Sequence, residues 1–343
     1  EREIIGFGSG VGSHGEDNYT ISTEQFSFAD IHSRLQAAIQ QLYAAEADWS
    51  PDDCNAVAKG VMHVAPELSG LSLVRATGAA DQHIRDFMAY ALTRKLLRGT
   101  EELLCESLIS LDAYRHWFDL SNNLRRPDLM WMRVELLADG RLHVKLHLIE
   151  CKMGQQSLEH ILKAKLQINN GLSVLGSAFK SSTGVPGGAG SIEDRPDRRY
   201  WWMQLHRLIA SKTEVSKKEY SAVLAALERL AEGDFLVTWE ASVFAFWIDQ
   251  DPEIKHAGYW SAADGLNVTA HAYTVGGEFV RRLMTDSLEH PVDWAAINTQ
   301  EAVVIDQDDG FISGDAEDDR SPWTYFEDED EEDPSEDEVP DPV

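Results

Sequence analysis

The chain has 343 residues, of which 43% are hydrophobic, and a formal net charge of −29. It is long enough for one large domain or two ordinary ones, and its acidity argues against a free-standing protein that grips nucleic acid through a broad basic surface. No apolar run approaches the roughly 20 residues of a membrane span, and three cysteines without a CxxC pair argue against a disulfide scaffold or structural zinc, so the composition indicates a cytoplasmic protein with no membrane partner.

The chain opens with a glycine-rich segment. Five glycines from Gly6 to Gly15 suggest a dinucleotide loop, but that loop needs a buried strand before it and a helix directly after it. Here only Glu3–Phe7 precedes the glycines, and Asn18–Thr23 has the pattern of another strand. We therefore expect a flexible or turn-rich lead-in. Because the first residue is Glu1 and not Met, we also expect the chain to be part of a longer polypeptide.

Helical spacing of apolar residues follows. It predicts a helix at Phe26–Ala45 and another at Asp81–Leu97, with a proline- and aspartate-containing turn at Ser50–Asp53 between them. A further short helix is expected at Glu101–Asp112. These segments predict a mainly helical N-terminal region, residues 1–78, and helices that pack on a sheet.

The next segment changes to the two-residue period of strands. Leu129–Leu137 and Arg141–Cys151 alternate apolar and polar residues around a tight turn, Ala138–Gly140, which predicts a β-hairpin. His143 and His147 share one face of the second strand. A pair of histidines can bind zinc, but no third ligand is suitably spaced, so we expect an exposed or DNA-facing strand surface.

The remaining body alternates helical and strand patterns around a mobile loop. Tyr200–Trp202, preceded by arginines, fits either base stacking or a helix start with core aromatics. The expected elements are a helix at Ser157–Leu175, a loop at Ser181–Pro196, helices at Tyr200–Ala210 and Lys217–Glu232, strands at Phe235–Ile248 and Asn267–Thr274, and a helix at Glu278–Ser287.

The C-terminal segment is strongly acidic. Residues 306–341 hold 18 acidic residues against one base, Arg320, with hardly any apolar periodicity, so we expect a disordered tail. A linker, a DNA mimic and a docking arm for a basic partner all fit this composition. Without the tail, 41 acidic and 29 basic residues leave the body at −12. If DNA is the substrate, a partner or a bound metal must help to hold it.

Three polar residues coincide around the hairpin. Asp128 stands at the mouth of the first strand, and Glu150 and Lys152 close the second strand with one residue between them. A period of two puts Glu150 and Lys152 on the same face, and the tight turn brings residue 128 back beside residue 150. We therefore expect the three side chains to converge at the open end of the sheet.

This set has the chemistry of a metal-dependent phosphodiesterase. Mg²⁺ prefers oxygen ligands, so Asp128, Glu150 and the main-chain carbonyl of Cys151 make a sensible site for it, or for Mn²⁺. Phosphodiester cleavage requires a metal to polarise the phosphate and activate a water, and it gains from a fixed cation near the developing charge. Lys152 fits that role.

Pro127-Asp128 and Glu150-Cys151-Lys152 resemble the signature of the PD-(D/E)XK nuclease superfamily. The resemblance covers residues 81–175, with a last core strand at 235–248, and implies that Gln167 contributes to the site, as in the RecB-like subgroup. Two departures stand out. The helix before the hairpin has no glutamate, so Gln82 or Asp86 would have to serve, and Gly171 stands where the family often has a tyrosine.

The resemblance implies an α/β fold with a restriction-endonuclease-like core, in which a mixed sheet is flanked by helices. We expect three parts: the mainly helical region 1–78, a nuclease-like domain with a helical insertion at 79–300, and the acidic disordered tail at 301–343. The expected activity is Mg²⁺-dependent cleavage of DNA. The alternative is a catalytically inactive module of the same fold that binds DNA or serves as a scaffold.

A second resemblance concerns partners. Asn18–Thr23 and Ile109–Phe118 look like stretches of large FtsK/HerA-type ATPases of bacterial DNA restriction and phage defence, such as DptH-like proteins. No GxxxxGK[ST] motif occurs in the chain, so the motor would lie elsewhere in the parent polypeptide or in a partner. This resemblance implies a translocase partner within a restriction or antiviral complex. The sequence is compatible with either a monomer or an oligomer.

Overall fold

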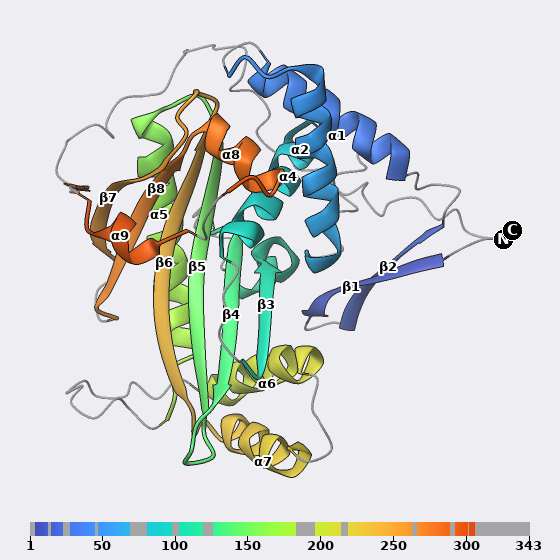
Figure 1. The fold of residues 1–343 in the computed structure, drawn as a ribbon. Helices are drawn as coiled ribbons and strands as arrows, with labels where there is room; N and C mark the ends of the chain where they lie inside the picture. Colours follow the sequence, from blue (N-terminus) through green and yellow to red (C-terminus); the bar gives the residue numbers. More distant parts are fainter. Residues whose placement is uncertain are drawn as a thin grey trace, which may run out of the picture. The chain divides into compact units, whose positions relative to one another are not determined.

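A seven-stranded mixed sheet lies at the centre of the structure, a computed structural model (Figure 1). The described residues are 4–12, 15–22, 28–44, 47–68, 81–97, 103–118, 126–182, 196–213, 219–262, 266–288, 292–300 and 302–305. The helices are α1 (Phe28–Tyr43), α2 (Pro51–Val64), α4 (Asp81–Leu96), α5 (Leu158–Ala178), α6 (Arg198–Lys212), α7 (Tyr220–Ala231), α8 (Gly277–Met284) and α9 (Trp294–Asn298), with 3-10 helices η1 (Ala65–Glu67) and η2 (Leu111–Trp117). The strands are β1 (Ile4–Gly12), β2 (Gly15–Ser22), β3 (Cys105–Ser110), β4 (Leu129–Leu136), β5 (Leu142–Gly154), β6 (Leu236–Trp247), β7 (Ile254–Ala262), β8 (Val268–Val275) and β9 (Val303–Val304).

The strand order in the sheet is β3-β4-β5-β6-β8-β7-β9. β3, β4 and β5 form an antiparallel meander, and β6 then runs parallel to β5 after the crossover through α5, α6 and α7. β8 continues parallel to β6, β7 pairs antiparallel with β8, and β9 is parallel to β7. β1 and β2 form a separate antiparallel pair.

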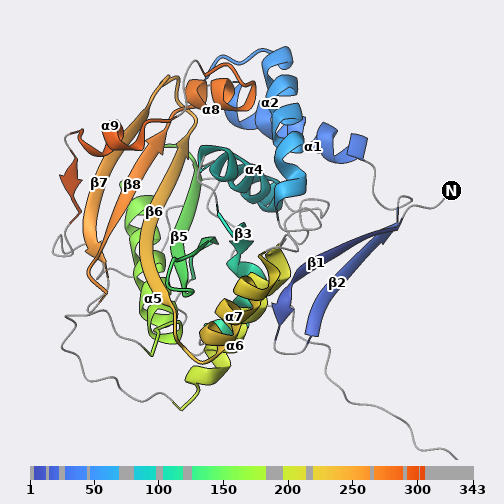
Figure 2. The same ribbon diagram turned by 60° about the horizontal axis from the view of Figure 1, so that its bottom comes forward.

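Helices cover both faces of the seven-stranded sheet. α1, α2, α4 and α8 share one apolar core with one face, and Figure 2 places them together on that side. α5, α6 and α7 share a second core with the other face. The two-residue period of β5 divides its side chains accordingly, because Ile149 joins the first core while Leu146 and Leu148 join the second. The fold is therefore α/β, with a mixed sheet flanked by helices, as expected.

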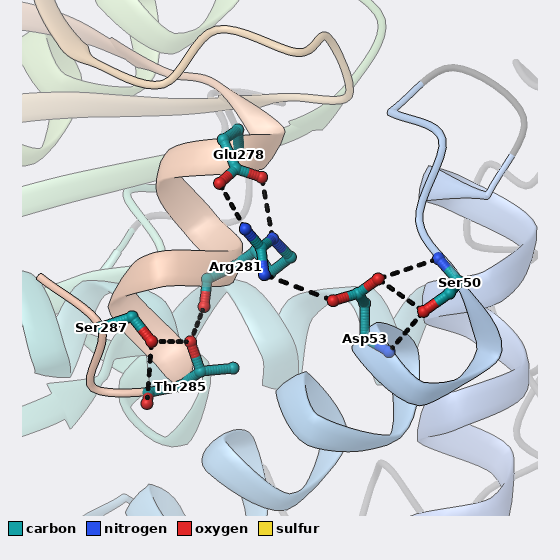
Figure 3. Close-up of polar contacts among 6 residues, drawn as sticks. All are labelled: Ser50, Asp53, Glu278, Arg281, Thr285 and Ser287. Atoms are coloured by element: carbon teal, nitrogen blue, oxygen red, sulfur yellow. Dashed lines mark hydrogen bonds and ion pairs between the residues drawn. The ribbon is translucent and has the colours of Figure 1, made fainter.

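A polar link joins α2 to α8 (Figure 3). Ser50 caps α2 by accepting a hydrogen bond from the Asp53 amide, while the Asp53 carboxylate accepts from the Ser50 amide. The other carboxylate oxygen of Asp53 accepts from Arg281 of α8 at 3.3 Å. Arg281 in turn holds Glu278 through two bonds of 2.8 and 2.6 Å. This chain of contacts ties the N-terminal helices to the helix that follows β8.

Most predicted elements are confirmed. The structure has helices at α1, α4, α5, α6, α7 and α8 and strands at β4, β5, β6 and β8, where the periodicities predict them. Among the described residues, no helix is long and apolar enough to cross a membrane. The tail was expected to be disordered from residue 301, but Val303–Val304 form strand β9, which pairs with β7. Residues 306–343 of the tail and residues 183–195 of the predicted mobile loop lie outside the described residues.

Three expectations differ from the structure. The segment Glu101–Asp112, predicted as a helix, contains strand β3, which pairs with β4 over its whole length. The predicted turn at Ser50–Asp53 is the capped start of helix α2. The glycine-rich lead-in, expected to be flexible or turn-rich, forms the hairpin β1-β2, with a register shift between Gly8 and Val11. Within it, β2 confirms the strand pattern of Asn18–Thr23 as far as Ser22. Strands β7 and β9 and helix α9 were not predicted.

Candidate active site

Asp128 and Glu150 meet where β4 begins and its pairing with β5 ends, although β5 itself continues to Gly154 beside β6. The register pairs Leu129 with Ile149, so the residue before β4 comes to lie opposite Glu150. The Asp128 amide donates to Glu150 Oε2 at 3.0 Å, and the Cys151 amide donates to Asp128 Oδ2 at 2.9 Å. These reciprocal bonds between side chain and backbone hold the two carboxylates at adjoining positions.

Lys152 and Gln167 complete the cluster. Lys152 Nζ donates to Glu150 Oε1 at 2.6 Å and to Gln167 Oε1 at 2.9 Å. Gln167, on α5, donates through Nε2 to the main-chain carbonyl of Arg126 at 3.1 Å. The glutamine therefore bridges the lysine and the segment that leads to Asp128. The four side chains predicted for the site thus lie in one connected network.

The packing of α5 explains Gly171. A Cβ atom at this position would come within 2.4 Å of the Pro127 side chain and 3.0 Å of Leu148. α5 can approach the start of β4 this closely only with a glycine there, and the same approach brings Gln167, one turn earlier, to Lys152. The departure from the tyrosine of the resembled family therefore has a packing reason.

Burial dominates the electrostatics of the site. Glu150 is 1% exposed, and this burial, with the nearby Asp128 carboxylate, raises the pKa of Glu150 well above its usual range. Burial also raises the pKa of Asp128, against the attraction of Lys152. Burial alone would lower the pKa of Lys152, but the charges of Glu150 and Asp128 together raise it. We expected these residues at an open strand end; the structure instead buries the glutamate.

Helix α4 forms a further wall of the site that the sequence did not indicate. Thr93 Oγ1 lies 3.3 Å from the Cys151 sulfur, so the thiol points to α4, away from the face of Glu150, as expected for a side chain that is not a metal ligand. The pKa of Tyr90 is raised by burial, and then by the charges of Asp128 and Asp86. Asp86 lies one turn before Tyr90 on α4, close enough to act on its phenol. The side chain of Gln82 lies outside the described residues.

The donor set fits a hard divalent cation coordinated partly by water or substrate. Among the described residues, no group of three or more His, Cys, Asp and Glu side chains is placed to hold a metal. The cluster offers two carboxylates and the neighbouring Cys151 carbonyl. Mg²⁺ is commonly bound by one or two carboxylates plus waters and substrate phosphates, and not by a complete protein cage. Burial raises the pKa of both Asp128 and Glu150, and a bound cation would stabilise their charged forms.

Comparison of the chain with protein-family models, with curated proteins and with solved structures gives no match in any of the three.

Other residues singled out from the sequence take different places. His143 and His147 share a face of β5, but His147 is only 7% exposed, so the expectation of an exposed strand surface is wrong for it. Of the aromatic run, Trp201 is buried in the second core, whereas Tyr200 is exposed. Of the two interpretations of this run, a helix start with aromatic residues in the core is confirmed for Trp201.

Proposed function

We propose that the chain is a Mg²⁺-dependent DNA nuclease that hydrolyses phosphodiester bonds. The observation that carries this proposal is the bonded network of Asp128, Glu150, Lys152 and Gln167 at adjoining ends of β4 and β5. The pKa values of both acidic groups are raised by burial beside Lys152. Titratable groups perturbed in this way are concentrated at functional sites.

Each residue has a role in the proposed reaction. Asp128, Glu150 and the Cys151 carbonyl would hold the cation, which when bound polarises the scissile phosphate and lowers the pKa of an attacking water. Lys152 places a fixed positive charge beside the phosphoryl group, where negative charge develops. Gln167 orients the lysine, because its amide oxygen accepts from Nζ while its amide nitrogen is anchored to the backbone of Arg126.

The element order supports the proposal. α4 is followed by the antiparallel strands β3, β4 and β5, then by helix α5 and, after α6 and α7, by β6 parallel to β5. The resemblance to PD-(D/E)XK nucleases implies such a core of helix, hairpin, helix and final strand. The position of the network at the end of the hairpin is also where that resemblance expects the chemistry.

Charge supports a partner that holds the DNA. The body, residues 1–305, carries −12, and such a surface repels the phosphate backbone most strongly at low salt. We propose that an ATP-driven translocase, in a restriction or phage-defence complex, supplies the affinity that the chain lacks. The same acidity also favours the alternative function, an inactive module of this fold that binds DNA with a partner or serves as a scaffold.

The test is incubation of the purified chain with supercoiled, linear and single-stranded DNA in Mg²⁺, Mn²⁺ or EDTA. The proposal predicts slow cleavage of at least one DNA form with either metal and none with EDTA. Cleavage that persists in EDTA would contradict the metal-dependent mechanism. No cleavage of any form at high protein concentration, in either metal, would favour the inactive module.

A further inference from the structure

A cavity of about 490 Å³ lies on the face of the sheet opposite Glu150. Side-chain alternation along β5 puts His147, which lines the cavity, and Glu150 on opposite faces. The cavity spans β3, β4, β5, β6 and β8 and is bordered by α9. Its volume falls within the range of about 300–1,000 Å³ that is typical of small-molecule sites. It is therefore a second candidate site, separate from the carboxylate cluster.

Aromatic side chains form much of the cavity lining. Phe244, Tyr273 and Trp294 contact one another with ring centroids 5.1 to 5.8 Å apart. Across the cavity, Trp131 of β4 lies beneath the guanidinium of Arg133, whose central carbon is 4.1 Å from the ring centroid. Aromatic rings and guanidinium planes are the surfaces on which flat heterocycles stack.

Two carboxylates add hydrogen-bond acceptors to this aromatic lining. Glu106 Oε1 accepts from Trp131 Nε1 at 2.9 Å and from Arg94. Glu240 Oε2 accepts from Arg133 at 2.7 Å. Within the part of the chain that the structure describes, neither second carboxylate oxygen has a hydrogen-bonding partner. The arginines therefore hold both carboxylates in place and leave acceptors for a ligand that brings N–H donors.

The cavity floor is polar but does not form a nucleophilic centre. His147 Nε2 lies 2.9 Å from Ser242 Oγ. Its Nδ1 lies 3.4 Å from Glu240 but makes no hydrogen bond within the described residues, so the three side chains have the order of a serine, histidine and carboxylate triad without its second hydrogen bond. Burial lowers the pKa of His147 to about 3, which keeps the ring neutral. However, Ser242 lies in the middle of β6, which is paired with β5 on one side and β8 on the other. The backbone amides that would stabilise an oxyanion there are already used in the hydrogen bonds of the sheet. We therefore regard Ser242, His147 and Glu240 as polar lining of the cavity and not as a catalytic triad.

We propose that this cavity binds one nucleobase with amino and ring N–H donors, guanine above all. Guanine presents two adjacent donors that match a carboxylate, and its bicyclic ring suits the aromatic lining of Phe244, Tyr273 and Trp294. Thymine and uracil present carbonyl oxygens on both sides of their single ring N–H, and these would face Glu106 and Glu240 unfavourably. The same chemistry can come from a free nucleoside or from a base turned out of a polynucleotide. The proposal does not depend on nuclease activity.

The test is isothermal titration calorimetry of the full chain in EDTA with guanosine, cytidine, adenosine and thymidine. A second arm uses single-stranded oligothymidylate with and without one central guanine. Guanosine should bind about tenfold or more tightly than thymidine. If free guanosine binds, a nucleoside is sufficient as the ligand. If only the guanine-containing oligonucleotide binds, the base must come from a polynucleotide. Either outcome supports the site.

Variants locate the binding. Glu240→Gln removes an exposed carboxylate, and Trp294→Ala removes a stacking surface on α9; each should weaken guanine binding about tenfold or more. Glu159→Gln, which alters an exposed carboxylate on α5 across the sheet, is the matched control and should bind as wild type does. Glu150→Gln should also bind normally, which separates this site from the proposed nuclease centre. The proposal is overturned if neither guanosine nor the guanine-containing strand binds, if thymidine binds equally well, or if both cavity variants bind normally.

Discussion

Two carboxylate clusters in this protein have opposite electrostatic character. Between α2 and α8, Asp53 and Glu278 share the guanidinium of Arg281 at a partly exposed surface (Figure 3). The hydrogen bond from Ser50, and then the charge of Arg281, lower the pKa of Asp53. At the ends of β4 and β5, by contrast, burial raises the pKa of both Asp128 and Glu150 although Lys152 is adjacent.

The difference separates a structural contact from a candidate reactive centre. The α2–α8 link satisfies its carboxylates with protein donors and needs nothing further. The strand cluster buries Glu150 and partly buries Asp128 beside Lys152, and burial raises the pKa of both carboxyl groups, so a bound cation would stabilise their charged forms. A fold that keeps such a cluster gains a place for a divalent cation. The predictions below therefore compare changes in the two clusters.

The largest expected effect is loss of cleavage. Glu150→Gln should reduce DNA cleavage about 100-fold or more, because it removes a proposed metal ligand and the partner of Lys152. Lys152→Ala and Asp128→Ala should have similar effects. The matched control is Asp53→Asn, which alters the α2–α8 link and should leave the activity of the folded protein unchanged. Near wild-type cutting by a folded Glu150→Gln variant would remove the basis of the assignment.

A smaller effect is expected at Gln167. Gln167→Ala removes the acceptor of Lys152 and the anchor to the Arg126 carbonyl, but leaves both carboxylates in place. Cleavage should fall about tenfold, since a bond to a charged group contributes about 1.5–3 kcal/mol and water replaces part of it. Steady-state cleavage rates of Gln167→Ala and Glu150→Gln measure the ranking. Equal losses in the two variants would contradict the positioning role.

The smallest expected effect is on stability, and its sign differs between the clusters. Because the folded-state pKa of Glu150 is raised, stability falls as pH rises from the unfolded-state value of about 4.3 through the folded value. Glu150→Gln should therefore gain stability relative to wild type as pH rises.

Asp53 has a lowered pKa, so its stabilisation is present above about pH 3.9 and is lost as pH falls through the folded value. Asp53→Asn should therefore be less stable than wild type at neutral pH, with a smaller difference in acid.

Urea unfolding in EDTA at pH 5 and pH 8 measures both differences. The same sign of pH dependence for the two substitutions would show that the clusters do not differ as described.

The hairpin and its cluster could be predicted from the sequence because they depend on local rules. Alternation fixes the faces of β5, and the tight turn fixes the register that brings Asp128 to Glu150. Tyr90 and Thr93 could not be predicted at the site, because only the packing of α4 on β5 brings them there. The burial of Glu150 likewise depends on helices distant in sequence.

Strands β3 and β7 were missed for different reasons. In β3, Cys105, Leu108 and Ile109 have helical spacing, and only pairing with β4 makes the segment extended. In β7, buried and exposed residues alternate, but one of the buried positions is held by the polar residue His256. The alternation of apolar and polar residues in the sequence is therefore weaker than the alternation of burial in the strand. The cavity opposite Glu150 combines residues of five strands and was not predictable from any one segment.

The strand cluster is expected to bind a divalent cation, whereas the α2–α8 link is not. Isothermal titration calorimetry with Mn²⁺ tests this expectation directly on wild type, Glu150→Gln and Asp53→Asn without any DNA. Wild type and Asp53→Asn should both show a Mn²⁺ site, and its affinity should fall about tenfold or more in Glu150→Gln. Equal Mn²⁺ binding by wild type and Glu150→Gln, or no binding by wild type, would contradict it.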